Sequence, residues 1–106
     1  MTRSAWLALS FLMVAPLAAN DDISDDRQQE LRNLLIQDCG SCHGMTLKGG
    51  LGPALLPEAL AGKPADYLRH VISKGVPDKA MPPWENILQP KEIDFLVTYL
   101  QQGSAQ

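Results

Sequence analysis

Residues 37–45 contain both cysteines of the chain and one of its two histidines, in the order Cys39, Cys42, His43. Two thiols three residues apart, with an imidazole directly after the second, suit three kinds of site. These are a redox-active disulfide, part of a zinc site, and the C-x-x-C-H sequence that attaches a c-type haem. Each requires a different fold around it, so this segment constrains the fold more than any other.

A zinc site has too few suitable ligands. A structural zinc ion takes four ligands, typically with a second Cys or His pair elsewhere in the chain. Beyond residues 39–43, His70 is the only further Cys or His side chain in the sequence. Because His43 directly follows Cys42, the two side chains are awkwardly placed to bind one tetrahedral ion together.

A thioredoxin-type disulfide lacks its usual setting. Such a C-x-x-C lies between a strand and a helix in a βαβ unit, whereas this one lies at the end of a helical pattern. The two thiols could still form a disulfide in an oxidising compartment. We interpret that disulfide as an off-pathway state of the protein before its cofactor is attached.

Three helical patterns and no alternating strand pattern predict an all-α fold. The first helix is expected over about 26–38, with Leu31, Leu34 and Leu35 as its apolar stripe and Asp25 and Gln28 forming a capping box. The others are expected from 64 to just before Gly75 and from 90 to just before Gly103, with a short helix over 57–61. The predicted apolar row of the helix from residue 64 is Tyr67, Leu68, Val71 and Ile72. That of the helix from residue 90 is Ile93, Leu96, Val97 and Leu100, with Phe95 and Tyr99 as a second row.

Two long loops, residues 44–57 and 75–90, are rich in Gly and Pro. Loops of this length in a small domain are usually functional or packed on something. A single domain of this size also has a marginal core. Since two cysteines cannot build a disulfide framework, we expect a large bound cofactor to complete the core.

The N-terminus predicts an exported protein. Residues 1–19 have the layout of a signal peptide, with Arg3 before an apolar run and small residues at its end. The mature domain would then be residues 20–106, outside the cytoplasm; an uncleaved membrane anchor is the alternative. The net charge of −3 comes without a basic stripe, so neither nucleic acid nor, after cleavage, a membrane is an expected partner.

The haem alternative uses every part of C-x-x-C-H. Thiols at i and i+3 at the end of a helical turn can reach the two vinyl groups of one porphyrin. The next residue, His43, then lies under the iron as its proximal ligand. Gly44 allows the backbone to turn away beneath the ring.

Met81 is the predicted sixth ligand of the iron. Two other methionines leave with the signal peptide, and Met45 is too close to His43 to reach the opposite face of the ring. Pro82 and Pro83 follow Met81 and reduce the entropy lost in holding its sulfur at the iron. His70 is the rival ligand and would make a bis-His haem.

The segments DCGSCHG, GPAL and MPPW, in this order, resemble the small monohaem class I c-type cytochromes over essentially the whole mature chain. The run QDCGSCHGMTLKGGLGPALLPEALAG is similar to the cytochrome c55X group of denitrification, which is associated with the haem-containing nitrite reductase. The resemblance implies three to four short helices wrapped around one covalently bound haem c. It also implies thioethers at Cys39 and Cys42 and axial ligands His43 and Met81.

The resemblance implies further details of the site. In such cytochromes a Gly-Pro-x-Leu loop, here Gly52, Pro53 and Leu55, packs on the proximal side of the haem. The proline carbonyl then holds the non-ligating nitrogen of the ligand histidine. The first and last helices are expected to cross near the haem, and Trp84 either packs on the haem or fills the small core.

The expected function is one-electron transfer by a monomer that is not an enzyme, because a His/Met haem has no open iron position. The expected partner is the periplasmic nitrite reductase, with weak and fast docking. Loop lysines could steer an acidic partner or be merely solubilising; they are Lys48, Lys63, Lys74 and Lys79. Two alternatives remain, an accessory protein for haem maturation or assembly of the nitrite reductase, and a gas sensor or small peroxidase in which Met81 dissociates.

Overall fold

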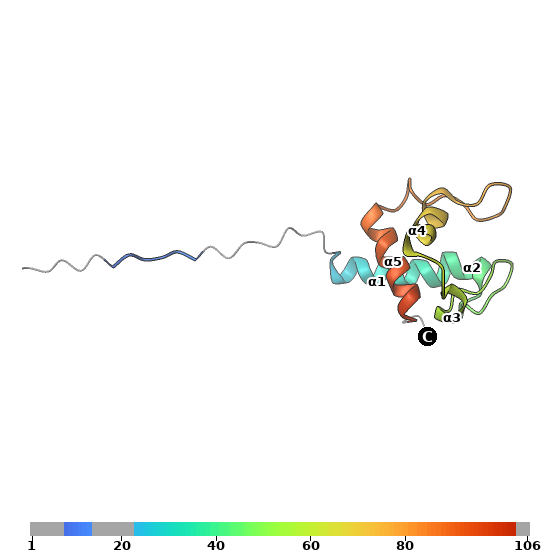
Figure 1. Ribbon diagram of the computed structural model, residues 1–106, viewed down its shortest axis with the longest axis horizontal. Coiled ribbons are helices and arrows are strands. Elements are labelled where there is room, and N and C mark those ends of the chain that lie inside the picture. The colour runs from blue at the N-terminus through green and yellow to red at the C-terminus, as the bar shows by residue number, and fades with distance from the viewer. Residues whose placement is uncertain (1–7, 14–22, 104–106) are drawn as a thin grey trace, which may run out of the picture.

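The computed structural model describes residues 8–13 and 23–103. Residues 8–13 have no regular secondary structure and are exposed; the rest of the predicted signal peptide lies outside the described residues. Residues 23–103 form helices joined by loops, and the described part of the chain contains no strand. The predicted all-α class is therefore confirmed (Figure 1). None of the described helices is long and apolar enough to cross a membrane.

The N-terminal helix is longer than predicted and changes its winding. It consists of α1 (Asp25–Leu34), the π-helical segment η1 (Leu35–Cys39) and α2 (Gly40–His43), which follow one another as a single rod (Figure 1). The rod ends where Gly44 takes a φ of 93°, a value that favours glycine.

The predicted capping box at the start of this helix was wrong. The N-cap is Ser24, whose hydroxyl accepts a hydrogen bond from the Arg27 backbone N–H at 3.2 Å. The Gln28 side chain instead donates to the carbonyl oxygen of Ile23 at 2.9 Å. Ser24 and Asp25 are both good N-cap residues, so the sequence pattern did not distinguish them.

The other helices agree with the predicted ranges to within one residue. They are α3 (Pro57–Leu60), α4 (Ala65–Lys74) and α5 (Pro90–Gln102). Pro64 is the N-cap of α4 rather than its first helical residue. Gly75 and Gly103 follow α4 and α5 with φ of 69° and 74°, as expected for helix ends closed by glycine.

The core lies where α1 and η1 meet α5, with α3 and α4 packed against α5. Leu31 and Leu35 are 0 % and 1 % exposed. They form one cluster with the apolar row predicted for α5, which is Ile93, Leu96, Val97 and Leu100. The partly buried Leu34, Phe95 and Tyr99 pack against this cluster. The predicted contact between the first and last helices is confirmed.

The apolar row predicted for α4 was wrong at Tyr67, which is 54 % exposed. The full buried set is Leu31, Leu35, Leu47, Leu60, Leu68, Leu88, Ile93, Leu96, Val97 and Leu100.

An ion pair joins the starts of α1 and α5. The Glu92 carboxylate is 6 % exposed and pairs with the Arg27 guanidinium. It also accepts the Gln89 backbone N–H at 2.9 Å, as one half of the capping box of α5. The hydrogen bond from Arg27 holds the pKa of Glu92 below its usual value. This pair fixes where the rod crosses α5.

Candidate functional site

The C-x-x-C-H residues lie together at the C-terminal end of the rod. Cys39 is the last residue of η1, while Cys42 and His43 belong to α2. All three are partly buried, both thiols are free, and Cys39 packs against the core. Burial raises the pKa of the Cys39 thiol to about 11. A redox-active C-x-x-C requires a lowered thiol pKa, so this environment disfavours the disulfide interpretation.

The loop over residues 44–56 folds back against the end of the rod. The backbone N–H of Gly49 donates to the carbonyl oxygen of His43, and that of Gly52 donates to the carbonyl oxygen of Cys42, each at 2.8 Å. Further along, Leu55 N–H donates to Leu47 O at 2.9 Å, and both leucines pack in or against the core. These bonds satisfy carbonyls that the end of a helix leaves without partners. They also hold the loop beside the imidazole of His43.

The His43 ring is oriented by the loop. Its Nδ1 lies 2.6 Å from the carbonyl oxygen of Pro53, which is the contact expected from the family resemblance. Because a carbonyl oxygen only accepts, Nδ1 must be the donor, so in the neutral imidazole the lone pair of Nε2 is available to a metal. Gly52 lies so close that a Cβ there would be 2.8 Å from ring atoms Nδ1 and Cε1.

Met81 comes from the second loop, residues 75–89. Its carbonyl oxygen accepts the Val76 N–H at 3.1 Å, and the Trp84 N–H donates to the carbonyl oxygen of Ile72 at 3.0 Å. A Cβ at Gly75 would lie 2.6 Å from the Met81 oxygen. These contacts tie the loop to the end of α4 and leave Met81 partly buried.

Figure 1 places the two loops at the end of the molecule away from the start of α1. The structure thus brings Cys39, Cys42 and His43 together on one helix end, and it supplies Met81 from a separate loop. The rival ligand, His70, is exposed on α4. Within the described residues no group of three or more His, Cys, Asp or Glu side chains could hold a metal ion, so a zinc site gains no support. The arrangement fits a haem in which both C-x-x-C thiols and the His43 Nε2 take part.

The surroundings of the loops refine two expectations. Trp84 packs against the core cluster, as expected for an aromatic residue that fills a small core. Lys74 forms an ion pair with Glu85 at 2.7 Å. Its charge is therefore compensated, whereas Lys48, Lys63 and Lys79 are exposed.

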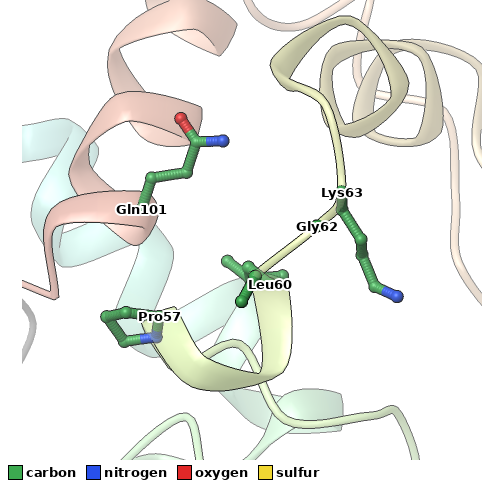
Figure 2. A pocket seen from close by; sticks show the side chains of 6 residues that line it. Pro57, Leu60, Gly62, Lys63 and Gln101 are labelled. Atoms are coloured by element: carbon green, nitrogen blue, oxygen red, sulfur yellow. The ribbon is translucent and has the colours of Figure 1, made fainter.

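A small cavity lies elsewhere, between α3 and the end of α5 (Figure 2). Its volume is about 190 Å³. None of the four predicted site residues lines it. The lining residues are Pro57, Leu60, Ala61, Gly62, Lys63 and Gln101.

Comparisons with known proteins agree with this geometry. The profile of the family described as cytochrome c oxidase, cbb3-type, subunit III matches residues 26–100. Cytochrome c55X from Pseudomonas aeruginosa is 47 % identical over 96 % of this chain and 87 % of its own length. The Stutzerimonas stutzeri protein of the same name is 48 % identical over 92 % of this chain and 86 % of its own. The chain belongs to the cytochrome c55X family.

Solved structures confirm the fold of this c55X family member. The c-type cytochrome NirC is 49 % identical, with a TM-score of 0.76 over 78 % of this chain and 98 % of that one. Cytochrome c6 from the diatom Phaeodactylum tricornutum, at 20 % identity and a TM-score of 0.55, shares the fold alone. The expected class I cytochrome c architecture is confirmed. Family membership together with C-x-x-C-H at residues 39–43 supports a covalently attached haem c.

One partial match concerns an enzyme. Dihydro-heme d1 dehydrogenase from Pseudomonas aeruginosa is 41 % identical over 67 residues, which are 63 % of this chain and 14 % of the enzyme. The enzyme thus contains a short segment similar to this cytochrome. The relatives as a group identify a c-type cytochrome of the denitrification system.

Proposed function

We propose that the protein is a periplasmic one-electron carrier that donates electrons to the nitrite reductase of denitrification. The observation that supports this proposal most directly is the hydrogen bond from His43 Nδ1 to Pro53 O at 2.6 Å. It prepares Nε2 for iron and fixes the plane of the imidazole before any metal binds. When bound, one haem c supplies an iron that alternates between ferrous and ferric states.

Cys39 and Cys42 would attach the porphyrin. Each sulfur would form one thioether bond to the porphyrin, and the same vinyl group would take up the thiol hydrogen, so that attachment would need no oxidant. The thiols lie on neighbouring turns of the rod, and a neutral Cys39 thiol carries the hydrogen that the addition consumes.

His43 and Met81 would be the axial ligands, which leaves no iron position for a substrate. The thioether of Met81 favours ferrous iron and raises the reduction potential relative to a bis-His site. Its loop is held by backbone hydrogen bonds to the end of α4, which would limit movement of the ligand between redox states. A carrier, rather than an enzyme, follows from this ligand set.

An optical spectrum tests the ligand set. Protein exported to the periplasm is expected to show a haem c spectrum with the weak far-red sulfur-to-iron band, and carbon monoxide is expected to leave it unchanged. Met81→Ala is expected to lose the band and to bind carbon monoxide, while His70→Ala is expected to keep the wild-type spectrum. Loss of the band in His70→Ala, or carbon monoxide binding by the wild type, would contradict the assignment.

Electron transfer is tested separately by stopped flow. Reduced cytochrome is mixed with oxidised nitrite reductase, and haem absorbance is followed with and without excess nitrite. We expect reoxidation within one turnover of the enzyme. A reduced cytochrome that persists through many turnovers would reject nitrite reductase as the acceptor.

A second candidate function is electron transfer during haem maturation. The partial match to dihydro-heme d1 dehydrogenase supports it, because a dehydrogenase must pass its electrons to an acceptor. A deletion strain separates the two functions. Nitrite reductase that accumulates without its full haem complement would favour maturation, whereas complete enzyme starved of electrons would favour direct donation.

The domain boundaries and assembly are also proposals. We propose that residues 1–19 are removed on export and that residues 20–106 are the monomeric mature protein. N-terminal sequencing of the periplasmic protein and light scattering of the purified protein test both statements. A start at Asn20 and the mass of a single chain are expected.

A further inference from the structure

The rod widens immediately before the first haem-attaching cysteine. Residues Leu35–Cys39 form the π-helical segment η1, in which the Gly40 backbone N–H donates to the carbonyl oxygen of Leu35. That bond spans five residues instead of the four of an α-helix. Segments of this kind are rare, occur mostly as single turns inside α-helices, and are frequent at functional sites.

The spacing of the inward-facing residues shows what the wide turn does. Leu31, Leu35, Cys39 and His43 follow one another at intervals of four. In an α-helix each residue turns by about 100°, so each step of four overshoots a full turn by about 40°. Three such steps would rotate His43 by about 120° away from the face of Leu31. A π turn holds about one residue more than an α turn, so it cancels most of this drift.

The burial of side chains agrees with the corrected register. Leu31 and Leu35 are 0 % and 1 % exposed, and Cys39 packs against the same core cluster. Asp38 is exposed. In an uninterrupted α-helix Asp38, seven residues after Leu31, would lie within about 20° of Leu31 and point at the core. Burying an unpaired carboxylate there would destabilise the fold even if the group became neutral.

We propose that η1 is a positioning element for haem attachment. Its turn contains one residue more than an α-helical turn. Because of this extra residue, Cys39 and His43 lie on the same face of the rod as Leu31 and Leu35. The wide turn thereby directs the attachment sequence toward the haem while α1 stays docked on α5. This inference rests on the proposed attachment of haem at Cys39, Cys42 and His43.

Changes of chain length at the wide turn provide the test. Deletion of the exposed Gln37 removes the surplus residue, so the remaining residues form an α-helix with the same faces inward. Insertion of one alanine between Ile36 and Gln37 adds a second surplus residue. One π turn compensates for only one extra residue, so the insertion should rotate Cys39 and His43 off the face of Leu31. Gln37→Ala keeps the length and serves as the matched control. Each variant is exported to the periplasm and purified, and covalent haem per chain is measured by mass spectrometry, with the far-red band and the reduction potential as further readouts.

We expect the deletion variant and Gln37→Ala to keep full covalent haem and the far-red band. We expect the insertion variant to lose attachment at one or both cysteines, or to lose the band. Loss of covalent haem in the deletion variant, or wild-type haem in the insertion variant, would overturn the inference. If the wild type and Gln37→Ala also lacked covalent haem, the proposed attachment itself would be wrong, which distinguishes the two failures.

Discussion

Gly52 illustrates how tightly the chain surrounds His43, the proposed ligand histidine. A Cβ at this position would lie 2.8 Å from two atoms of the His43 ring, so in Gly52→Ala the ring or the loop must shift, which disturbs the hydrogen bond to Pro53. We expect a loss of about 1–3 kcal/mol in the free energy of unfolding. We also expect a shifted reduction potential, because the Nδ1 hydrogen bond tunes the iron. Denaturant unfolding and redox titration measure the two effects.

Gly62→Ala is the matched control for this substitution. Gly62 has a φ of 80°, and a Cβ there would meet no atom within 4 Å. The variant therefore carries backbone strain of about 1 kcal/mol without touching the haem site. Its potential is expected to equal that of the wild type. Gly52 itself has no positive φ, so an equal shift in both variants would show that contact with His43 is not what moves the potential.

Gly75 has the corresponding role for Met81. Gly75→Ala combines a φ of 69° with a Cβ 2.6 Å from the Met81 carbonyl oxygen, so the loop must move. We expect a weaker far-red band and partial binding of carbon monoxide, because Met81 then leaves the iron more readily. Carbon monoxide titration of the reduced protein measures this change. An unchanged spectrum would mean that the loop relaxes without moving the sulfur.

At the scale of elements, the Arg27–Glu92 pair joins the first and last helices. Glu92 is 6 % exposed, and Arg27 holds its pKa below the usual value of 4.5. A lowered carboxyl pKa stabilises the folded state fully above the usual value, and the contribution is lost as the pH falls through the lowered pKa. Glu92→Gln should therefore cost stability at pH 7 and flatten the fall in stability as the pH drops below the usual value of 4.5.

The expected cost at pH 7 is about 1–2 kcal/mol. It lies below the loss of about 3–5 kcal/mol for breaking a fully buried pair, because the Arg27 side chain is 38 % exposed and water can solvate it. Glu30→Gln removes the other partner of Arg27, which is 64 % exposed, and should change stability by less than about 1 kcal/mol. Thermal unfolding across pH compares the two. Equal effects would show that burial of Glu92 contributes nothing.

At the scale of the whole molecule, the net charge is negative while the loops around the site carry exposed lysines. Lys79 lies in the loop of Met81, and both its side chain and the neighbouring residues are exposed. Lys74, in contrast, forms an ion pair with Glu85. If the loops meet an acidic partner, Lys79→Gln should slow electron transfer at low salt by up to about tenfold and weaken its salt dependence. Lys74→Gln should have a smaller effect. Rates independent of both substitutions would mean that the lysines only keep the protein soluble.

The sequence predicted most about segments that carry local signals. The last helix starts at Pro90 and ends before Gly103 as expected, because proline and glycine have fixed conformational preferences at helix ends. Its apolar row is buried for the same local reason, a period that matches the helix. The attachment segment and both loops were also predicted.

Features that depend on contacts between distant residues were missed. Leu47 and Leu88 lie in loops without periodicity, yet both are 2 % exposed because the loops fold onto the core. Glu92 is buried only because Arg27, far away in the chain, reaches it. Tyr67 fits the helical period of α4 but is 54 % exposed, because the packing of the described residues leaves it outside the core cluster.

By itself the sequence predicted the site chemistry of this protein, two thiols, an imidazole and a thioether in the order found in c-type cytochromes, and the helix ends marked by proline and glycine. The tertiary structure alone decided how these groups are aimed. The His43 hydrogen bond to Pro53 needs a loop folded back over ten residues. The wide turn of η1 arises because the leucine row, docked on α5, and the attachment sequence must share one face. Orientation results from packing between segments: only the family resemblance predicted the Pro53 contact, and nothing in the sequence predicted the wide turn.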